Sequence, residues 1–429
     1  MPTGTLTTMT AWTADPSANE QTLTAVPAVT GMRNAIRDYD WGSTSALALL
    51  QSRTPSGGPE AELWMGTHPS APSVLLLTDG DATRELPLPE AIDRFGEQVL
   101  GREVLERFGP RLPYLFKILA IARPLSVQVH PTAARAREKY TPGSDSPYVD
   151  PYHKPEMLYA LEPIEALYGF RPPAQVAMLL SRLRAPRLQE LIEVLSAPAA
   201  TDEARLRAGL ELLVTWPVED RAALVAEVAA GSSRLAAEGS PDYPEVFGWL
   251  DRLIGLHPAD PMVLAPLLLD LVRMSPGQTV FVDAGVPHAY LSGLGVEIMA
   301  GSDNVLRCGL TTKEVNVGEL LDVVDTHPLA SGDSNLTPLS EEEVAWRPPV
   351  EDFQLSRIAV NSPAEPQPAD PSVRGPQIVL CTKGAVTVTA DGVSVALEPG
   401  HSAFVTASAG PITLTGEGEV FRAAPGETR

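Results

Sequence analysis

The hydrophobic periodicity of this chain changes twice along its length, and that change limits the possible folds more than any single motif does. Between Met32 and Phe170, short apolar runs are broken by Gly, Pro and Asp, a pattern typical of β-strands. From about Pro173 to Met274, apolar residues recur at i, i+3, i+4 and i+7, as they do along one face of an amphipathic helix. Strands return after Ser275. The pattern predicts a mainly β protein with an α insertion.

The predicted helical block repeats its apolar spacing three times, and its Ala, Leu, Glu and Arg content favours helix. We interpret the apolar stripe as core and assign it no chemistry. Its members are Val176, Leu179, Leu180 and Leu183, then Leu188, Leu191, Ile192 and Leu195, and then Leu206, Leu210 and Leu213.

The last part of the chain is predicted to be a second β region. A Pro-rich stretch near residues 361–376 reads as a connection, and the alternation in residues 379–421 is that of strands. Within it, residues 385–389 and 393–397 flank an Asp391-Gly392 dipeptide, which predicts a β-hairpin with a tight turn.

A weak internal repeat links the two β regions. The sequence PGQTVFVDAGVPH from Pro276 matches PGHSAFVTASAGP from Pro399 at one constant offset, and His288 falls opposite Pro411. A Pro-Gly turn followed by a strand is common in all-β folds, so the match also fits coincidence. Two related β-barrels, with a metal-capable histidine only in the first, are the simplest interpretation.

Charge narrows the class of partner. The 429-residue chain has 32 basic and 54 acidic residues, a formal net charge of -22 and a pI of about 4.7. Nucleic acid and anionic membranes both require a basic surface, so neither is expected as a partner. An anionic small molecule requires only a local basic pocket. We expect a monomer that acts on a small-molecule substrate.

Cysteine usage and the N-terminal residues favour a cytoplasmic location. Cys308 and Cys381 are too few and too far apart in sequence for a disulfide framework or a thiolate metal site. No apolar run approaches the 18 or more residues of a membrane span. Residues 1–31 contain no Lys or Arg, so they lack the charged region of a secretory signal, and we expect a flexible tail there.

The segment from Gly285 to Lys313 is the richest in candidate functional residues. Glycines and small apolar residues separate His288, Glu297, Asp303 and Arg307 within it, in a pattern of strand, turn, strand and polar loop. A β-barrel can direct several such side chains toward one interior point. Charged residues are seldom drawn into such a position without a partner or a function.

Four residues form a candidate metal-ligand set. Gln128 and His130 are two apart in a predicted strand and therefore share a face. Glu156 follows His153 and Lys154 in a Pro-framed loop, and His288 lies at a predicted strand end. Alone, each would fit an exposed strand or a solvated turn. Together, two imidazoles, a carboxylate and an amide oxygen suit Zn²⁺ or another divalent transition metal, and Lys154 suits a proton-transfer group beside it.

Two basic residues downstream suggest recognition of an anion. Arg307 and Lys313 lie close to the candidate ligands in an otherwise acidic chain, and a guanidinium fork matches phosphate geometry. The alternative is simple salt bridging of these two residues to Asp303 or Glu314. Cys308 reads as a small packed residue and not as a nucleophile.

Several motifs together resemble those of type I phosphomannose isomerases. They are Arg37-Asp-Tyr-Asp-Trp-Gly, Glu62-Leu-Trp-Met-Gly-Thr-His-Pro, Leu112-Pro-Tyr-Leu-Phe-Lys, Gln128-Val-His-Pro, His153-Lys-Pro-Glu, and the long stretch from Pro287-His-Ala-Tyr-Leu-Ser-Gly to Gly309-Leu-Thr. The resemblance runs from about Arg33 to Val324 in the expected order, with weaker similarity to the C-terminus.

The resemblance implies two cupin-type β-barrels, or jelly rolls, plus a helical domain. The domain boundaries expected on this basis follow the pattern changes. Residues 1–31 would be the tail, residues 32–172 and 273–330 the catalytic barrel, residues 173–272 the inserted helical domain, and residues 331–429 a metal-free second barrel.

The resemblance also implies a site and a reaction. One Zn²⁺ per chain would be held by Gln128, His130, Glu156 and His288, and mannose 6-phosphate and fructose 6-phosphate would interconvert through a cis-enediol. Catalytic roles would fall to Arg307, Lys154 and Asp303. Substrate-binding roles would fall to Arg307, Lys313 and Glu297. In the family, the product commonly feeds GDP-mannose biosynthesis.

The sequence departs from the family motif at two positions, and two alternative functions fit parts of it. Thr312 stands where Pro is common in the family, and Asn316 where an acid is common, so the shape of this loop is in question. A metal oxygenase of the cupin class would usually show a His-x-His pair and would not need Arg307 with Lys313. A non-catalytic or differently specific sugar-phosphate-binding cupin is the other alternative, although all four ligands are present.

Overall fold

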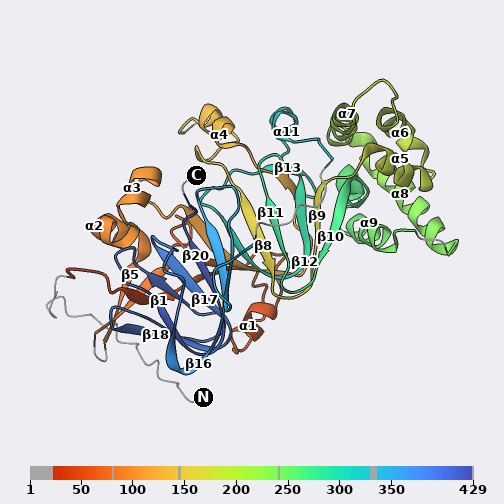
Figure 1. Ribbon diagram of the computed structural model, residues 1–429. Coiled ribbons are helices and arrows are strands. Elements are labelled where there is room, and N and C mark those ends of the chain that lie inside the picture. Colours follow the sequence, from red (N-terminus) through yellow and green to blue (C-terminus); the bar gives the residue numbers. More distant parts are fainter. Residues whose placement is uncertain (1–22, 80–81, 144–145, 240–241, 329–335, 428–429) are drawn as a thin grey trace, which may run out of the picture.

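The computed structural model describes residues 23–79, 82–143, 146–239, 242–328 and 336–427 of the 429-residue chain. Within these ranges the backbone forms two ten-stranded sheets, and a group of helices lies at one end of the molecule, beside the first sheet (Figure 1). No helix in the described ranges has the length and apolarity that a membrane span requires.

The first sheet is organised around one long strand, β12 (His288–Ala300). This strand pairs with β6 and β7 along one edge, and with β8 and β9 along the other. The pairing order among the described residues runs from β10 to β2 without closing into a ring, so the expected barrel is an open sheet. The other strands are β2 (Ala35–Arg37), β3 (Glu62–Met65), β6 (Tyr114–Ile121), β7 (Val127–Val129), β8 (Glu156–Ala160), β9 (Ile164–Phe170), β10 (Leu269–Met274), β11 (Thr279–Val282) and β13 (Leu306–Gly309).

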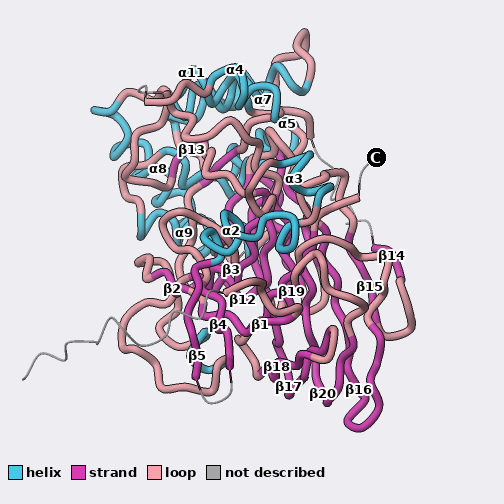
Figure 2. The backbone as a smooth tube through the Cα atoms, turned by 90° about the vertical axis from the view of Figure 1, so that its left-hand side faces the viewer, coloured by secondary structure: helices cyan, strands magenta, loops and turns pink. Residues whose placement is uncertain are grey.

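The second sheet combines both ends of the chain. Strand β1 pairs with β19 on one side and with β4 on the other, and β4 pairs with β5 (Figure 2). The members are β1 (Val29–Arg33), β4 (Val74–Asp79), β5 (Ala82–Pro87), β14 (Leu336–Pro338), β15 (Glu343–Trp346), β16 (Gln354–Pro368), β17 (Gln377–Ala390), β18 (Val393–Leu397), β19 (Ser402–Val405) and β20 (Thr413–Ala424).

This sheet differs from the expected domain division in two ways. The tail expected up to residue 31 overlaps β1, which begins at Val29, and Val26 before it is buried. Residues 74–87, expected in the catalytic barrel, pair within the C-terminal sheet instead. The physical reason is a shared core: Met32, Leu75 and Leu86 pack in one hydrophobic cluster with Phe404 and Phe421. Pattern reading could not reveal such a long-range strand pairing.

The expected helical insertion is present, and its apolar stripe is buried. Val176, Leu180, Leu191 and Leu210 are at most 1% exposed in one hydrophobic cluster. The insertion ends at Leu268 rather than 272, because Leu269 already pairs with β9. Its elements are α5 (Pro173–Arg182), η1 (Pro186–Leu188), α6 (Gln189–Leu195), α7 (Asp202–Val214), α8 (Val218–Ala237), α9 (Pro244–Leu256), η2 (Pro261–Leu264) and α10 (Ala265–Leu268). The remaining helices are α1 (Ala46–Leu50), α2 (Leu88–Leu100), α3 (Arg102–Phe108), α4 (Ala133–Lys139) and α11 (Val317–Val323).

The two segments of the internal repeat adopt the same local structure. Gly277 and Gly400 both have positive φ, +97° and +77°, and each begins the turn before a four-residue strand, β11 or β19. The partners also correspond. Val282 of β11 lies opposite Glu156, and Val405 of β19 lies opposite Gln377. In the second sheet, Gln377 therefore occupies the position that the candidate metal ligand Glu156 occupies in the first.

Two further predictions from the C-terminal sequence can be compared with the structure. The hairpin at Asp391-Gly392 is present, with positive φ at both residues, as this tight turn requires. The Pro-rich connection was expected to begin near residue 361, whereas β16 continues to Pro368. A register shift between Ser362 and Gln367 leaves the intervening prolines out of the hydrogen-bonded ladder.

Candidate metal centre and substrate pocket

The first sheet brings the four expected metal ligands together. Gln128 lies on β7 and His130 directly follows that strand, while Glu156 and His288 are the first residues of β8 and β12. His288 pairs with Gln128 across the β7–β12 ladder. The carboxylate oxygens of Glu156 lie 3.3 Å from His130 Nε2 and 3.4 Å from His288 Nε2.

Backbone carbonyls orient both imidazoles. Nδ1 of His130 lies 2.9 Å from the Asn304 carbonyl, and Nδ1 of His288 lies 3.0 Å from that of Val286. Each Nδ1–H therefore donates to a carbonyl, and each Nε2 is left as a lone-pair donor aimed at Glu156. Fixing a ligand imidazole through its other nitrogen is the usual arrangement at protein metal sites.

The cluster fits a metal ion. The ligand atoms of His130, Glu156 and His288 lie within 4.8 Å of one another, and all three residues are buried. His130 Nε2 and Glu156 Oε2 have no hydrogen-bond partner in the described structure. Buried polar atoms are seldom left unsatisfied, and two imidazoles with one carboxylate suit Zn²⁺.

Gln128 completes the set from the side of the substrate pocket. Its side-chain amide nitrogen lies 3.4 Å from His288 Nε2. The O and N atoms of an amide exchange places on a half-turn of the side chain, so the same rotamer can present an oxygen to a cation.

The ionisation states of the cluster also suit a cation. Burial lowers the pKa of His130 to about 4, although the Glu156 carboxylate opposes that shift, so the imidazole is neutral near pH 7. Burial alone would raise the pKa of Glu156. The nearby Lys154 ammonium and His130 outweigh burial and hold that pKa well below its ordinary value.

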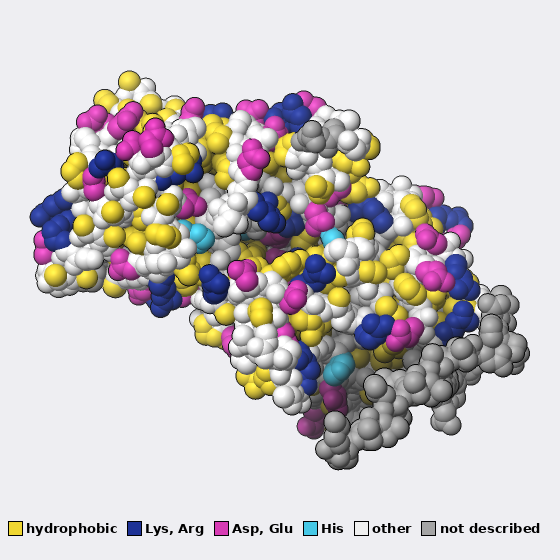
Figure 3. All heavy atoms as spheres, turned by 180° about the vertical axis from the view of Figure 1, so that it is seen from behind, with side chains coloured by type: hydrophobic (Ala, Val, Ile, Leu, Met, Phe, Trp, Pro, Cys, Tyr) yellow, Lys and Arg dark blue, Asp and Glu magenta, His cyan; other side chains and the backbone are white. Residues whose placement is uncertain are grey.

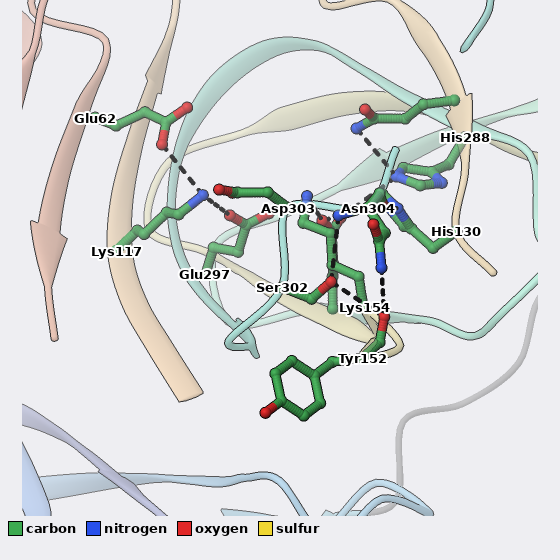
Figure 4. A network of polar contacts seen from close by, with 12 residues as sticks. Glu62, Lys117, His130, Tyr152, Lys154, His288, Glu297, Ser302, Asp303 and Asn304 are labelled. Atoms are coloured by element: carbon green, nitrogen blue, oxygen red, sulfur yellow. Dashed lines mark hydrogen bonds and ion pairs between the residues drawn. The ribbon is translucent and has the colours of Figure 1, made fainter. Parts of the chain in front are cut away.

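The loop before β8 places an ammonium beside the metal ligands. Lys154 Nζ lies 2.8 Å from Glu156 Oε1, and Lys154 is only 8% exposed. The side-chain amide of Asn304 donates to the carbonyls of Asp150 and Tyr152 and thereby fixes this loop (Figure 4). The expected neighbourhood of Lys154 and the metal ligands is therefore present.

A pocket of about 610 Å³ adjoins the cluster. The face shown in Figure 3 is hollowed near its centre, with charged side chains of both signs around the hollow. The lining contains five of the expected site residues, Gln128, Lys154, Asp303, Arg307 and Lys313. Its other members are Tyr39, Asp40, Trp41, Glu62, Trp64, Lys117, Arg123, Pro124, Leu125, Ser126, Val305, Leu256, His257, Leu310, Thr311 and Thr312.

Arg307 is a half-buried cation of the pocket wall. It lies on β13, and among the described residues no carboxylate or hydrogen-bond acceptor pairs with its guanidinium. Burial lowers its pKa below the ordinary value, because its charge is partly desolvated. The alternative salt bridge to Asp303 is absent, since Asp303 Oδ2 contacts His68 Nε2 at 2.7 Å. An anionic ligand would supply the hydrogen-bond acceptors that the Arg307 guanidinium lacks.

Glu297 occupies a different position from the other expected site residues. It is 3% exposed and pairs with Lys117 Nζ at 3.3 Å, and Lys117 in turn lies 3.2 Å from Glu62 (Figure 4). Lys117 and Glu62 line the pocket, whereas Glu297 lies behind Lys117. Burial raises the pKa of Glu297 to about 7, with the Lys117 ammonium opposing the shift.

Sequence reasoning missed Lys117, Glu62 and His68 as site residues. Lys117 interrupts a strand that is otherwise wholly apolar, and a charge in such a strand is a signal of a paired or functional group. Glu62 and His68 belong to the motif Glu62-Leu-Trp-Met-Gly-Thr-His-Pro, which contributed to the family resemblance but predicted no role for either residue. Cys308 is buried and its pKa is raised to about 12, so it is not a nucleophile, as expected.

The two departures from the family motif are accommodated. The Asn316 side chain accepts from the Glu319 backbone N–H at 3.0 Å and caps α11, a role for which Asn and Asp are equally suited. Thr312 is exposed at the pocket wall.

Family models match both sheets of the chain. The model described as phosphomannose isomerase type I, catalytic domain, matches residues 29–173. The one described as mannose-6-phosphate isomerase, cupin domain, matches residues 346–425. The catalytic-domain model thus covers β1 to β9, which belong to both sheets, and the cupin-domain model covers β16 to β20 of the second sheet.

Curated relatives cover almost the whole chain. The mannose-6-phosphate isomerases of Salmonella typhimurium and Escherichia coli are each 33% identical over 404 and 402 residues, which is 91% of this chain and 97% of each relative. The human mannose-6-phosphate isomerase is 34% identical over 361 residues, 78% of this chain and 83% of its own length.

Solved structures agree with the fold. A crystal structure of a variant phosphomannose isomerase from Salmonella typhimurium matches with a TM-score of 0.83 and 30% identity over 94% of this chain and 100% of that chain. A structure of mannose 6-phosphate isomerase bound with zinc and yttrium matches with a TM-score of 0.81, the same identity and the same coverage.

Proposed function

This chain belongs to the type I phosphomannose isomerases and is a zinc enzyme of that family, and from that premise we propose that it interconverts mannose 6-phosphate and fructose 6-phosphate through a cis-enediol. The observation that supports this most directly is the juxtaposition of the His130–Glu156–His288 cluster with a pocket whose Arg307 lacks a partner among the described residues.

The reaction moves one proton between two carbons. A base removes the proton from C2 of the aldose, the C1 carbonyl oxygen becomes a hydroxyl of the enediol, and return of the proton to C1 with loss of the O2 proton gives the ketose. The bound metal would supply positive charge that stabilises the enediolate oxygens. The ligands that would hold it are Gln128, His130, Glu156 and His288.

We assign the proton transfer to Lys154. Its Nζ is within hydrogen-bond reach of Glu156 Oε1 and it lines the pocket, so an amine is held beside the position where the sugar carbons would lie. Asp303 lines the same pocket and is fixed by His68, which suits a role in orienting sugar hydroxyls. Glu297 would act through Lys117, as a positioning residue.

The phosphate is expected at the basic side of the pocket. Arg307 offers a planar fork of donors, and Lys313 offers a positive charge on a flexible stem, since it is exposed and has no carboxylate partner in the described residues. Holding the phosphate there supplies binding energy remote from C1 and C2.

Zinc-loaded protein incubated with mannose 6-phosphate, with fructose 6-phosphate followed, tests the reaction. Lys154→Ala should bind zinc normally and lose at least about 100-fold in kcat. Near-normal turnover by that variant would remove Lys154 from the mechanism. Full activity after complete chelation of zinc would contradict the metal assignment. Binding of the sugar phosphate without turnover would indicate a binding protein instead.

A further inference from the structure

The helical insertion forms one wall of the substrate pocket. Leu256, the last residue of α9, and the adjacent His257 line the pocket together with the basic segment Arg307–Lys313. The chain then turns through Asp260 into η2, which lies against β13. The insertion therefore approaches the site at the residues expected to hold the phosphate.

One carboxylate joins the insertion to this basic segment. Asp260 Oδ1 accepts from the Met262 backbone N–H at 2.8 Å and so caps η2. Its other oxygen, Oδ2, accepts from the backbone N–H of Leu310 at 2.6 Å. Leu310 is 4% exposed, so its N–H has little access to water as an alternative partner.

The backbone at this junction is strained. Leu310 has φ +56°, in the left-handed region that residues other than Gly seldom occupy. Gly309 before it has φ +158°, and a Cβ there would lie 2.4 Å from Met262 of the insertion. Such strain persists where surrounding contacts hold it, and it clusters at functional sites.

The strained turn separates the two basic residues of this segment, Arg307 and Lys313, which both line the pocket. On its N-terminal side, Arg307 pairs with Gln128 in the β7–β13 ladder, and the ladder shifts register between Arg307 and Gly309. On its C-terminal side, Thr311, Thr312 and Lys313 form the pocket wall. The direction of the chain at Leu310 therefore decides how Arg307 and Lys313 face each other.

We propose that Asp260 is a positioning residue for phosphate recognition: the helical insertion uses it to fix the strained turn at Leu310 and thereby holds Arg307 and Lys313 in an arrangement that binds the phosphate group. This inference rests on the proposed function for the identity of the anion. It gives the helical insertion a role in binding the phosphate that is separate from the metal centre.

Asp260→Ser separates the two contacts of the carboxylate. Serine is a good helix cap, so it retains the contact to Met262, but its side chain is too short to reach Leu310 as well. Asp260→Ala removes both contacts. Thr201→Ala is the matched control, because Thr201 caps α7 in the same insertion through the Ala204 N–H and does not line the pocket.

Three quantities are measured on the zinc-loaded, full-length proteins: KM and kcat for mannose 6-phosphate, the inhibition constant of inorganic phosphate, and zinc content. In Asp260→Ser we expect KM and the phosphate inhibition constant to rise together by about fivefold or more, kcat to fall by a smaller factor, and zinc content to stay the same. Thr201→Ala should change none of these, although it lowers the melting temperature.

An unchanged KM and an unchanged phosphate inhibition constant in Asp260→Ser would overturn the proposal. So would an equal rise in Thr201→Ala, because the effect would then be general destabilisation. If Asp260→Ala fails to fold, Asp260→Ser decides. Calorimetric titration with inorganic phosphate distinguishes this proposal from the proposed function. Phosphate binding that depends on Asp260 in a protein without isomerase activity would retain this inference and reject the proposed function.

Discussion

At the scale of single residues, Asn304 connects the metal ligands with the Lys154 loop. Its backbone carbonyl accepts a hydrogen bond from His130 Nδ1–H. Its side-chain amide donates to the carbonyls of Asp150 and Tyr152, and its Oδ1 accepts from the Val149 N–H. One buried residue thus orients a ligand imidazole and fixes the loop that carries the proposed proton-transfer group.

Asn304→Ala should therefore weaken zinc binding without touching a ligand. The substitution leaves three backbone groups without their partner, and we expect a loss of about 2–4 kcal/mol in the free energy of unfolding. Zinc affinity should fall by about tenfold, because an outer partner of a ligand is disturbed. Urea denaturation and competition with a zinc chelator measure the two effects. Wild-type zinc affinity in a destabilised variant would contradict the link between the loop and the metal site.

The raised pKa of Glu297 predicts a distinctive pH dependence of stability. An unfolded glutamate titrates near 4.5, and the buried Glu297 near 7. At a pH between these two pKa values, the Glu297 carboxyl is protonated in the folded protein and ionised in the unfolded chain. The free energy of unfolding should therefore fall as the pH rises from about 4.5 to about 7, by up to ~3 kcal/mol from this group.

Glu297→Gln isolates that contribution, because glutamine has a similar shape and no proton to lose. Urea denaturation of both proteins across this pH range should give a stability difference that changes with pH in the stated direction. Parallel curves for the wild type and the variant would show that Glu297 is ionised throughout, as a permanent partner of Lys117.

At the scale of elements, β12 depends on glycine where its partners change from β7 and β9 to β6 and β8. Gly293 has φ +123°, and a Cβ there would lie 2.4 Å from the Pro163 carbonyl oxygen. Gly248 lies in the interior of α9, where a Cβ would meet no atom within 4 Å. The same substitution should therefore have opposite effects at the two sites.

Gly293→Ala should destabilise the protein by at least about 2 kcal/mol, since both the backbone conformation and the contact oppose a side chain. Gly248→Ala should stabilise it by about 0.5–1 kcal/mol, because alanine loses less backbone entropy in a helix. Thermal or urea denaturation measures both. A neutral Gly293→Ala would mean that the backbone around Gly293 and Pro163 can relax.

Prediction from sequence succeeded for elements with a strong local signal. The apolar stripe beginning at Val176 predicted the helices, and Asp391-Gly392 predicted the hairpin. The sequence also predicted that His130, Glu156 and His288 share one metal site, although that prediction required the family resemblance as well as the spacing. The direction of a side chain at a strand end is not encoded locally.

Long-range pairing could not be predicted in the same way. Nothing near Val29 indicates that β1 will pair with residues 402–405, because any exposed strand edge offers the same hydrogen-bonding groups. The Lys117 cluster escaped notice for a related reason: its partners lie on two other strands. Only the register of β6 brings Glu297 opposite Lys117 and Glu62 opposite the nearby Leu119.

At the scale of the whole molecule, the second sheet contacts the loop that carries Lys154. His153, which precedes Lys154, lies 2.7 Å from Asp352 of the segment before β16. Asp352 is 5% exposed, and Arg111 stacks over the adjacent Tyr152 at 3.7 Å. The second sheet therefore helps to hold the loop that carries the proposed proton-transfer residue.

His153→Ala should lower both stability and turnover. It leaves the Asp352 carboxylate buried without its partner, and we expect a loss of about 2–3 kcal/mol in the free energy of unfolding and a several-fold fall in kcat. His327→Ala removes a histidine from a similar pair with Asp325, but at a site that is 68% exposed, and should leave stability nearly unchanged. Equal effects of the two substitutions would contradict the role of the loop contact.

The pairing of β1 also has a consequence for synthesis on the ribosome. One edge of β1 pairs with β4, which is made soon afterwards, but its other edge pairs with β19, which is translated some 370 residues later. At about 5–20 residues per second, that edge waits roughly 20–70 s for its partner. During this time the nascent chain exposes an unpaired strand edge next to an apolar core. Chaperone demand during translation, more than the stability of the finished enzyme, should set how well this protein is produced.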